Sequence, residues 1–254
     1  MQNTRLIELL RTFKEKELLG LEDLISSKFF NKNEQLIKLF AEIKKYFPDF
    51  ERDELTKQNL HVKLFGKKKY NDEAMRTLIS GLMKLAKKYL VQLELEKRFY
   101  DSNVFLLTQL QKRAQQPLLE YEYSKAKAQT QEKLFHEREF YLTNYLADFE
   151  FFYSHPLGIK NIAKETELLE GIADNFENFM LHELMDINYQ MLTRKIKINY
   201  TPKYLLIDEA KKIIETKDFS DNPSLLLKYY SFMCIEDMEK EEYYEKSENL
   251  FLEC

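Results

Sequence analysis

The residues of this sequence with the most evident chemistry are cations gathered in one stretch. Between residues 57 and 90 lie nine Lys or Arg residues and two acidic residues, a local net charge of +7. Such side chains neutralise phosphates, and every phosphate contact makes binding more sensitive to salt. One hypothesis is therefore a nucleic-acid-binding surface, for which the candidate residues are Lys67, Lys68, Lys69, Arg76, Lys84, Lys87 and Lys88.

The order of elements expected in this basic stretch is typical of a helix-turn-helix over residues 56–90. Thr56 would cap a short helix that stops at Gly66, the loop GKKKYN would follow, and Asn71 would cap a longer helix. In that motif the second helix lies in the major groove of DNA. The stretch also resembles the winged-helix domain of transcription regulators, in which VQLELE (91–96) would form a reduced wing strand.

The opposing interpretation is a basic, solvated helix face that has no nucleic-acid role. The longer helix would begin with Asp72 and Glu73, whose carboxylates would repel phosphates. Only Asn71 and Arg76 would then be placed to read bases. Charge and motif together leave both interpretations open.

A second candidate surface is aromatic. Tyr and Phe crowd the region between residues 121 and 153, and four of them recur at helical spacing: Tyr141, Tyr145, Phe149 and Phe152. Aromatic side chains commonly pack in a core, but stacked helical hairpins also form grooves that take a partner helix. These four residues are the candidate contacts for a protein partner, and homo-oligomerisation is an alternative use of the same patch.

The other reactive residue types form no catalytic or metal-binding pattern. His182 and Asp186 lie four apart on an expected helix, but zinc takes three or four protein ligands, so we predict a surface or capping role for His182. His136 with Glu139 is equally incomplete, and Cys234 lies in the apolar run SFMCI and is expected in the core. The patterns GxxxxGK[ST], GxSxG and HExxH are missing. The sequence therefore predicts a non-enzymatic protein without metal or cofactor.

Helices must position all of these residues. Five Gly and five Pro in 254 residues are too few for the many turns of an all-β fold. Apolar side chains recur every three or four residues, most regularly at Met75, Leu78, Leu82, Leu85 and Tyr89. We predict an all-α protein, with an N-terminal helical domain (1–97) that is winged-helix-like in one alternative. An array of antiparallel helical hairpins of tetratricopeptide-like type (98–254) would follow.

The C-terminal domain shows three further features in sequence. A long helix is expected between Gly158 and Pro202, either continuous or broken once near Gly171, and Pro202 should open the next helix. The strict 34-residue tetratricopeptide signature is absent, which favours a hairpin array over membership of that repeat family. Residues 236–254 carry eight acidic residues and two lysines, a balance of −6, and the chain stops inside an expected helix. This abrupt end indicates either a truncated form of a longer protein or an element that docks elsewhere.

Parts of the chain resemble a known group of proteins. Residues 26–50, with the motif FNKN, and residues 55–90, with the motif KKYND, resemble the N-terminal region of uncharacterised all-helical proteins of the Bacteroidota. Residues 222–253 resemble the middle section of the same proteins. The resemblance implies an all-helical fold, a bacterial lineage and a chain that is normally longer, and it implies no activity.

The sequence also leads to expectations about the location and function of the protein. The N-terminus lacks a signal-peptide pattern and no window approaches about 18 consecutive apolar residues, so we expect a cytoplasmic protein without a membrane span. The favoured function is a non-enzymatic protein–protein interaction scaffold or adaptor. The alternative is a DNA-binding transcriptional regulator that uses residues 56–90.

Overall fold

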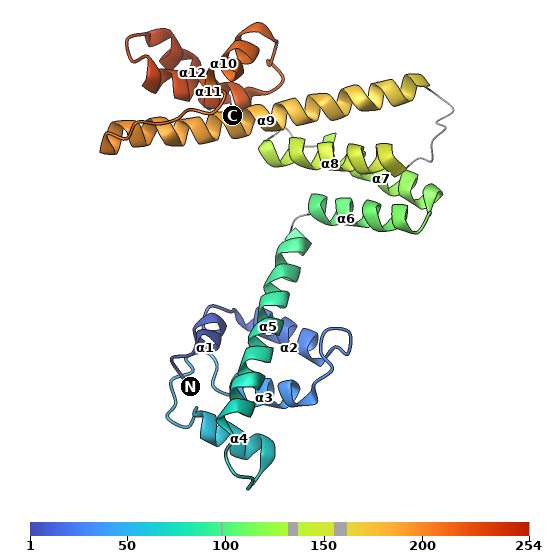
Figure 1. Ribbon diagram of the computed structural model, residues 1–254, viewed down its shortest axis with the longest axis vertical. Coiled ribbons are helices and arrows are strands. Elements are labelled where there is room, and N and C mark those ends of the chain that lie inside the picture. The colour runs from blue at the N-terminus through green and yellow to red at the C-terminus, as the bar shows by residue number, and fades with distance from the viewer. Residues whose placement is uncertain (98, 132–136, 155–161, 254) are drawn as a thin grey trace. The chain divides into compact units, whose positions relative to one another are not determined.

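The computed structural model of the protein describes residues 1–97, 99–131, 137–154 and 162–253, and it is shown in Figure 1. Within these ranges the chain is helical and contains no strand, which confirms the predicted all-α class. The chain divides into two compact units, Met1–Arg98 (unit 1) and Phe99–Cys254 (unit 2). None of the described helices combines the length and the apolar composition needed to cross a bilayer.

The described part of unit 1 forms five helices, and three of them begin at a side-chain cap. Side-chain oxygens of Asn33, Thr56 and Asn71 accept hydrogen bonds from backbone N–H groups in the first turn of the helices that follow them. Such bonds satisfy donors that have no partner within the helix, and each stabilises its helix by about 1 kcal/mol. The helices are α1 (Arg5–Leu10), α2 (Glu15–Ser26), α3 (Glu34–Lys44), α4 (Lys57–Phe65) and α5 (Asp72–Lys97).

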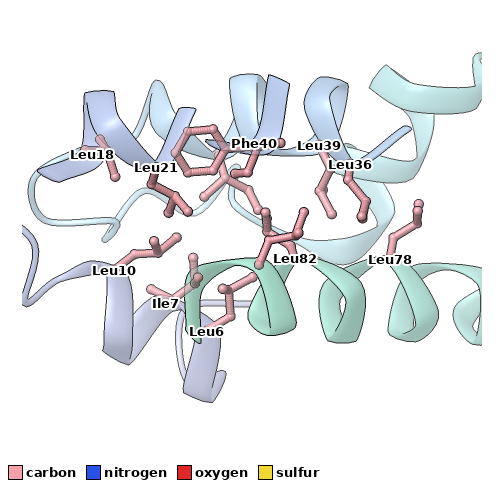
Figure 2. Packing of buried hydrophobic residues seen from close by; sticks show 14 of the residues in the cluster. Leu6, Ile7, Leu10, Leu18, Leu21, Leu36, Leu39, Phe40, Leu78 and Leu82 are labelled. Carbon is pink, nitrogen blue, oxygen red and sulfur yellow. The ribbon is translucent and has the colours of Figure 1, made fainter. Parts of the chain in front are cut away.

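The core of unit 1 lies along one face of α5. The apolar positions predicted on this helix are buried, from Met75 to Tyr89, because residues three and four apart share a helix face. Figure 2 shows labelled side chains of α1, α2, α3 and α5 pointing into the space between these helices. Each such side chain, when fully buried, contributes roughly 1.5–3 kcal/mol to folding. The opposite face of α5 is therefore left to the solvent.

The wing-strand alternative for VQLELE is wrong, because residues 91–96 lie inside α5. A single strand of six residues would need a neighbouring strand to pair its backbone N–H and C=O groups. The described part of unit 1 has no strand that could act as this neighbour. Continuing the helix satisfies those groups internally.

Unit 2 is organised around one long helix, α9. The helix α8 packs along α9, and α6 and α7 pack on α8. The helices α10 and α11 contact α9, on the other side of it from α8 in Figure 1, and α12 packs on α11. The bounds are α6 (Phe99–Lys112), α7 (Gln116–Gln131), α8 (Arg138–Ser154), α9 (Ile162–Ile198), α10 (Ile207–Thr216), α11 (Pro223–Glu236) and α12 (Glu241–Glu253).

The structure distinguishes the two alternatives left open for α9 and corrects the predicted start of the helix that follows it. The helix α9 runs for 37 residues without a break at Gly171, because the packing of α8 along it offsets the roughly 1 kcal/mol that a helical glycine costs. Pro202 does not open a helix, since α10 begins at Ile207. Asn188 of α9 exchanges hydrogen bonds of 2.8 and 2.9 Å with the backbone of Leu205, which holds the segment before α10 outside the helix.

Candidate functional site

Aromatic rings from α8 and α9 meet at the surface of unit 2. Tyr145, Phe149 and Tyr153 are four residues apart on α8 and therefore share one face. Their ring centroids are 5.9 Å (Tyr145–Phe149) and 4.5 Å (Phe149–Tyr153) apart. Phe176 of α9 joins them, with its ring 5.3 Å from that of Tyr145. We call these four residues the aromatic face.

Three of the four residues of the aromatic face are exposed, and Tyr145 is half-buried. Phe149 is 39% exposed, Phe176 is 46% exposed and Tyr153 is 60% exposed. Exposed Leu146 of α8 and Leu169 of α9 lie on the same two helices. Single exposed apolar residues are common, but contiguous ones mark surfaces that bind other molecules. The arrangement therefore has the physical character of a binding surface.

Two of the four aromatic residues singled out by sequence lie elsewhere. Tyr141 is buried at 7% exposure and its ring lies 5.6 Å from that of His182, so it belongs to the interior and cannot contact a partner. Phe152 is half-buried and meets Tyr153 edge-to-face. Sequence reasoning missed Tyr153, although it continues the four-residue spacing from Phe149. It also missed Phe176, because that contact depends on how α8 packs on α9.

A buried polar cluster lies beneath the aromatic face. Asp148, only 2% exposed, accepts hydrogen bonds from the Tyr123 hydroxyl at 2.8 Å, the Lys127 ammonium at 2.9 Å and the Asn175 amide at 3.1 Å. Burial, together with the charge of Asp148, raises the pKa of Tyr123. The donors come from α7 and α9 and the acceptor from α8, so the cluster fixes three helices together. Every oxygen of the carboxylate is occupied, which gives it a structural role and not that of a free base.

His182 is not the surface or capping residue predicted from sequence. It is fully buried, with Nε2 at 3.3 Å from Oδ1 of Asn222, the residue that caps α11. Burial, aided by the charge of Lys228, lowers the pKa of His182 to about 4. Asp186 forms an ion pair with Lys228 at 2.6 Å and leaves His182 without a second ligand group. In the described ranges, no three His, Cys, Asp or Glu side chains are grouped as a metal would require.

The basic candidates of unit 1 are exposed but differ in their surroundings. Lys67, Lys68 and Lys69 lie in the loop before α5, while Lys84, Lys87 and Lys88 lie on the solvent face of α5. These six residues are therefore accessible to an anionic ligand.

The two base-reading candidates at the start of α5 are already engaged. Arg76 pairs through Nε with Asp72 at 2.6 Å, and Asn71 caps α5 through the Ala74 N–H. Asp72 also accepts hydrogen bonds from Tyr70 at 2.8 Å and Lys57 at 3.2 Å, and these partners lower its pKa. The charged side chains at the start of α5, which a recognition helix would present to bases, are thus already paired with other groups of the protein.

The two units carry opposite charge. Unit 1 contains 21 Lys or Arg residues and 15 acidic residues, a net charge of +6. Unit 2 contains 18 basic and 28 acidic residues, a net charge of −10. Charge of this size governs which partners each unit attracts. Unit 1 favours anionic ligands, and unit 2 favours cationic ones.

The remaining candidates add no chemistry to these surfaces. Cys234 is half-buried and not fully in the core as predicted, and burial raises the pKa of its thiol, which keeps it protonated and a poor nucleophile. His136 and His155 lie outside the described residues, as does Cys254. Comparison of the chain with protein-family models, with curated proteins and with solved structures gives no match.

Proposed function

We propose that the protein is a non-enzymatic adaptor whose aromatic face binds an amphipathic helix of a partner protein. The observation that carries this proposal is the series of ring contacts from Phe176 through Tyr145 and Phe149 to Tyr153 at the surface of unit 2. Tyr and Phe are enriched at protein interfaces, where a few large side chains supply most of the binding energy. A helix with apolar residues at positions i, i+3, i+4 and i+7 presents a stripe that matches such a surface.

The negative charge of unit 2 indicates the charge that the partner should carry. Glu170 and Asp174 are exposed on α9, in the same stretch of helix as Leu169 and Phe176. Together with the net charge of −10, they favour a partner whose apolar stripe is flanked by Lys or Arg. The partner segment is thus a basic amphipathic helix.

The architecture proposed for this function is a short array of helical hairpins. The helices α6 to α12 would form the tetratricopeptide-like array expected from sequence over residues 98–254, and stacked hairpins of this type present an extended binding surface. A cytoplasmic location and kinship with the all-helical proteins of the Bacteroidota belong to the same proposal. They rest on the sequence patterns alone.

A defined peptide tests the proposal directly. The probe is a fluorescein-labelled 18-residue helix with Leu at i, i+3, i+4 and i+7 and Lys on both flanks, and binding is measured by fluorescence anisotropy at 100 mM salt. The double variant Phe149→Ala/Phe176→Ala should bind at least about tenfold more weakly, since truncating central aromatic residues commonly costs about 2 kcal/mol or more. The matched control is Tyr121→Ala/Tyr244→Ala, which removes two rings that are 63% and 62% exposed outside the aromatic face.

Three outcomes decide the matter. Weak binding by the aromatic-face variant alone supports the proposal. Equal losses in both double variants show non-specific apolar binding and overturn it. Sedimentation equilibrium covers the remaining case, because a wild-type dimer that the Phe149→Ala/Phe176→Ala variant converts to a monomer would assign the aromatic face to a second copy of the chain.

A further inference from the structure

Hollows follow one another along the solvent face of α5 in unit 1, on the side of the α2–α3 connection (27–33). One hollow of about 470 Å³ lies between Asn33 and the α5 residues Arg76, Ser80 and Lys84. The next, of about 490 Å³, is lined by Phe29 and Phe30 of the connection and by Lys87, Lys88, Val91 and Gln92 of α5. We call the two hollows together the α5 groove. The groove begins at Arg76, one of the two predicted base-reading residues, and extends along α5 to Gln92.

An aromatic ring is held outward at one end of the α5 groove. Phe29 is 87% exposed, and its ring meets that of Phe30 edge-to-face at 5.0 Å. The backbone around it is fixed by buried Asn31, which donates hydrogen bonds to the carbonyls of Ile25 at 2.9 Å and Asn33 at 3.0 Å. Asn31 also accepts one from the Asn33 N–H at 2.8 Å. An exposed ring on a fixed backbone therefore offers a surface on which a flat ligand can stack.

Cations line the groove beside this ring. Lys84, Lys87 and Lys88 are exposed, and the part of the chain that the structure describes offers none of them an ion pair. Lys28 and Lys32 in the connection are exposed as well. The acidic residues Glu34 and Glu73 lie toward the other end, where Arg76 is already paired with Asp72. Lys87 and Lys88 thus line the same hollow as the exposed ring.

We propose that the α5 groove binds single-stranded nucleic acid, with a base stacked on Phe29 and phosphates held by Lys84, Lys87 and Lys88. Surfaces that bind single strands combine a cationic groove along the backbone with aromatic rings on which bases stack. A duplex keeps its base faces within its own stack and has nothing to place on Phe29. An acidic peptide would use the lysines but has no regular supply of flat rings. The proposal concerns unit 1 and is independent of the aromatic face of unit 2.

The absence of Trp from the chain permits a direct measurement. Phe29→Trp places a single indole at the stacking position, and oligo(dT) of 12 nucleotides should quench its fluorescence as a base stacks on it. The matched control is Val62→Trp on α4, a position in the same unit that is 56% exposed and outside the groove. Saturable quenching at position 29 alone supports the proposal. Equal quenching at both positions, or none at position 29, overturns it.

Charge variants separate the α5 groove from the basic loop. In anisotropy with fluorescein-labelled oligo(dT), Lys84→Glu/Lys87→Glu/Lys88→Glu should abolish binding at 100 mM salt. Phe29→Ala should weaken binding about tenfold and leave the salt dependence unchanged, because it removes stacking and no charge. The matched control, Lys67→Glu/Lys68→Glu/Lys69→Glu, reverses the same number of charges in the loop and should retain most of the affinity.

Competing ligands complete the test. All variants change exposed residues, so their melting temperatures should match that of the wild type. A charge variant with a lower melting temperature is replaced by the corresponding Gln variant. If the loop variant loses as much affinity as the groove variant, the proposal is overturned. It is equally overturned if duplex DNA, or vesicles containing phosphatidylserine, bind as tightly as oligo(dT) and with the same dependence on Phe29.

Discussion

His182 of α9 and Asn222, the residue that caps α11, are joined in the interior of unit 2 by a contact of 3.3 Å between Nε2 and Oδ1. Asn222 also donates to Oδ1 of Asn178 at 2.8 Å and accepts from the Leu225 N–H at 3.1 Å. One amide therefore links the long helix to the start of α11. His182 is neutral in this arrangement, so the stability of unit 2 should depend on whether His182 is protonated.

Acidification should destabilise unit 2 through His182. Its pKa is about 4 in the folded protein and 6.5 in an unfolded chain, because burial and Lys228 oppose its charge more than Asn222, Asp186 and Glu139 favour it. The unfolded state then binds the extra proton first, so stability is complete above pH 6.5 and falls toward pH 4. Between pH 7 and pH 5 the loss should be about 2 kcal/mol. Urea unfolding of wild type and His182→Gln measures it, and parallel pH profiles of the two would contradict the assignment.

The buried polar cluster around Asp148 should lose different amounts of stability when the charge of Lys127 or that of Asp148 is removed. Lys127→Met leaves a carboxylate that is 2% exposed without its cation, and we expect a loss of roughly 3–5 kcal/mol. Asp148→Asn should cost less, because the Lys127 side chain is 33% exposed and can turn to water. The double variant should recover part of the loss. Chemical denaturation checks the order, with exposed Asp174→Asn as the control that should be near neutral.

Gly20 of α2 should resist a substitution that usually stabilises helices. Ala in place of Gly within a helix gains about 1 kcal/mol, but a Cβ at Gly20 would overlap the hydroxyl of Tyr89. Because Tyr89 is itself buried against this core, we expect Gly20→Ala to lower the melting temperature of unit 1. Adding Tyr89→Phe removes the overlapping atom and should restore part of the stability. A double-mutant cycle without coupling between the two positions would refute this packing.

The aromatic face should contribute little to folding. Phe149 and Phe176 are 39% and 46% exposed, so replacing each with Ala should change the free energy of unfolding by much less than Phe232→Ala, whose ring is fully buried. The buried substitution should cost about 3–5 kcal/mol. Differential scanning calorimetry of the three variants gives the comparison. A large loss at Phe149 or Phe176 would show that these rings serve the core and not a partner.

The local features of the fold were predictable from sequence. The 3.6-residue rhythm of Met75, Leu78 and Leu82 marks the buried face of α5, and the side chains of Thr56 and Asn71 cap helices as predicted. These features depend on residues within one or two helical turns of each other. Their energetics can therefore be judged without knowing the tertiary structure.

Features that depend on the packing of distant segments were not predictable in the same way. His182 has an unremarkable local sequence, and its burial follows from the approach of α11, some 40 residues away. The position of Phe29 beside Lys87 and Lys88 likewise follows from how the α2–α3 connection lies along α5. The Asp72–Arg76 pair is the exception, because its i, i+4 spacing is visible in the sequence.

The continuity of α9 affects how unit 2 folds. Its first half packs with α8, through contacts such as Tyr145–Phe176, and its second half packs with α10 and α11. Starting a helix is unfavourable by a factor of about 10⁻³, whereas extending one adds a hydrogen bond for each residue fixed. Whichever half forms first therefore supplies a nucleus for the other. The partners of the other half can then pack on a helix that has only to be extended.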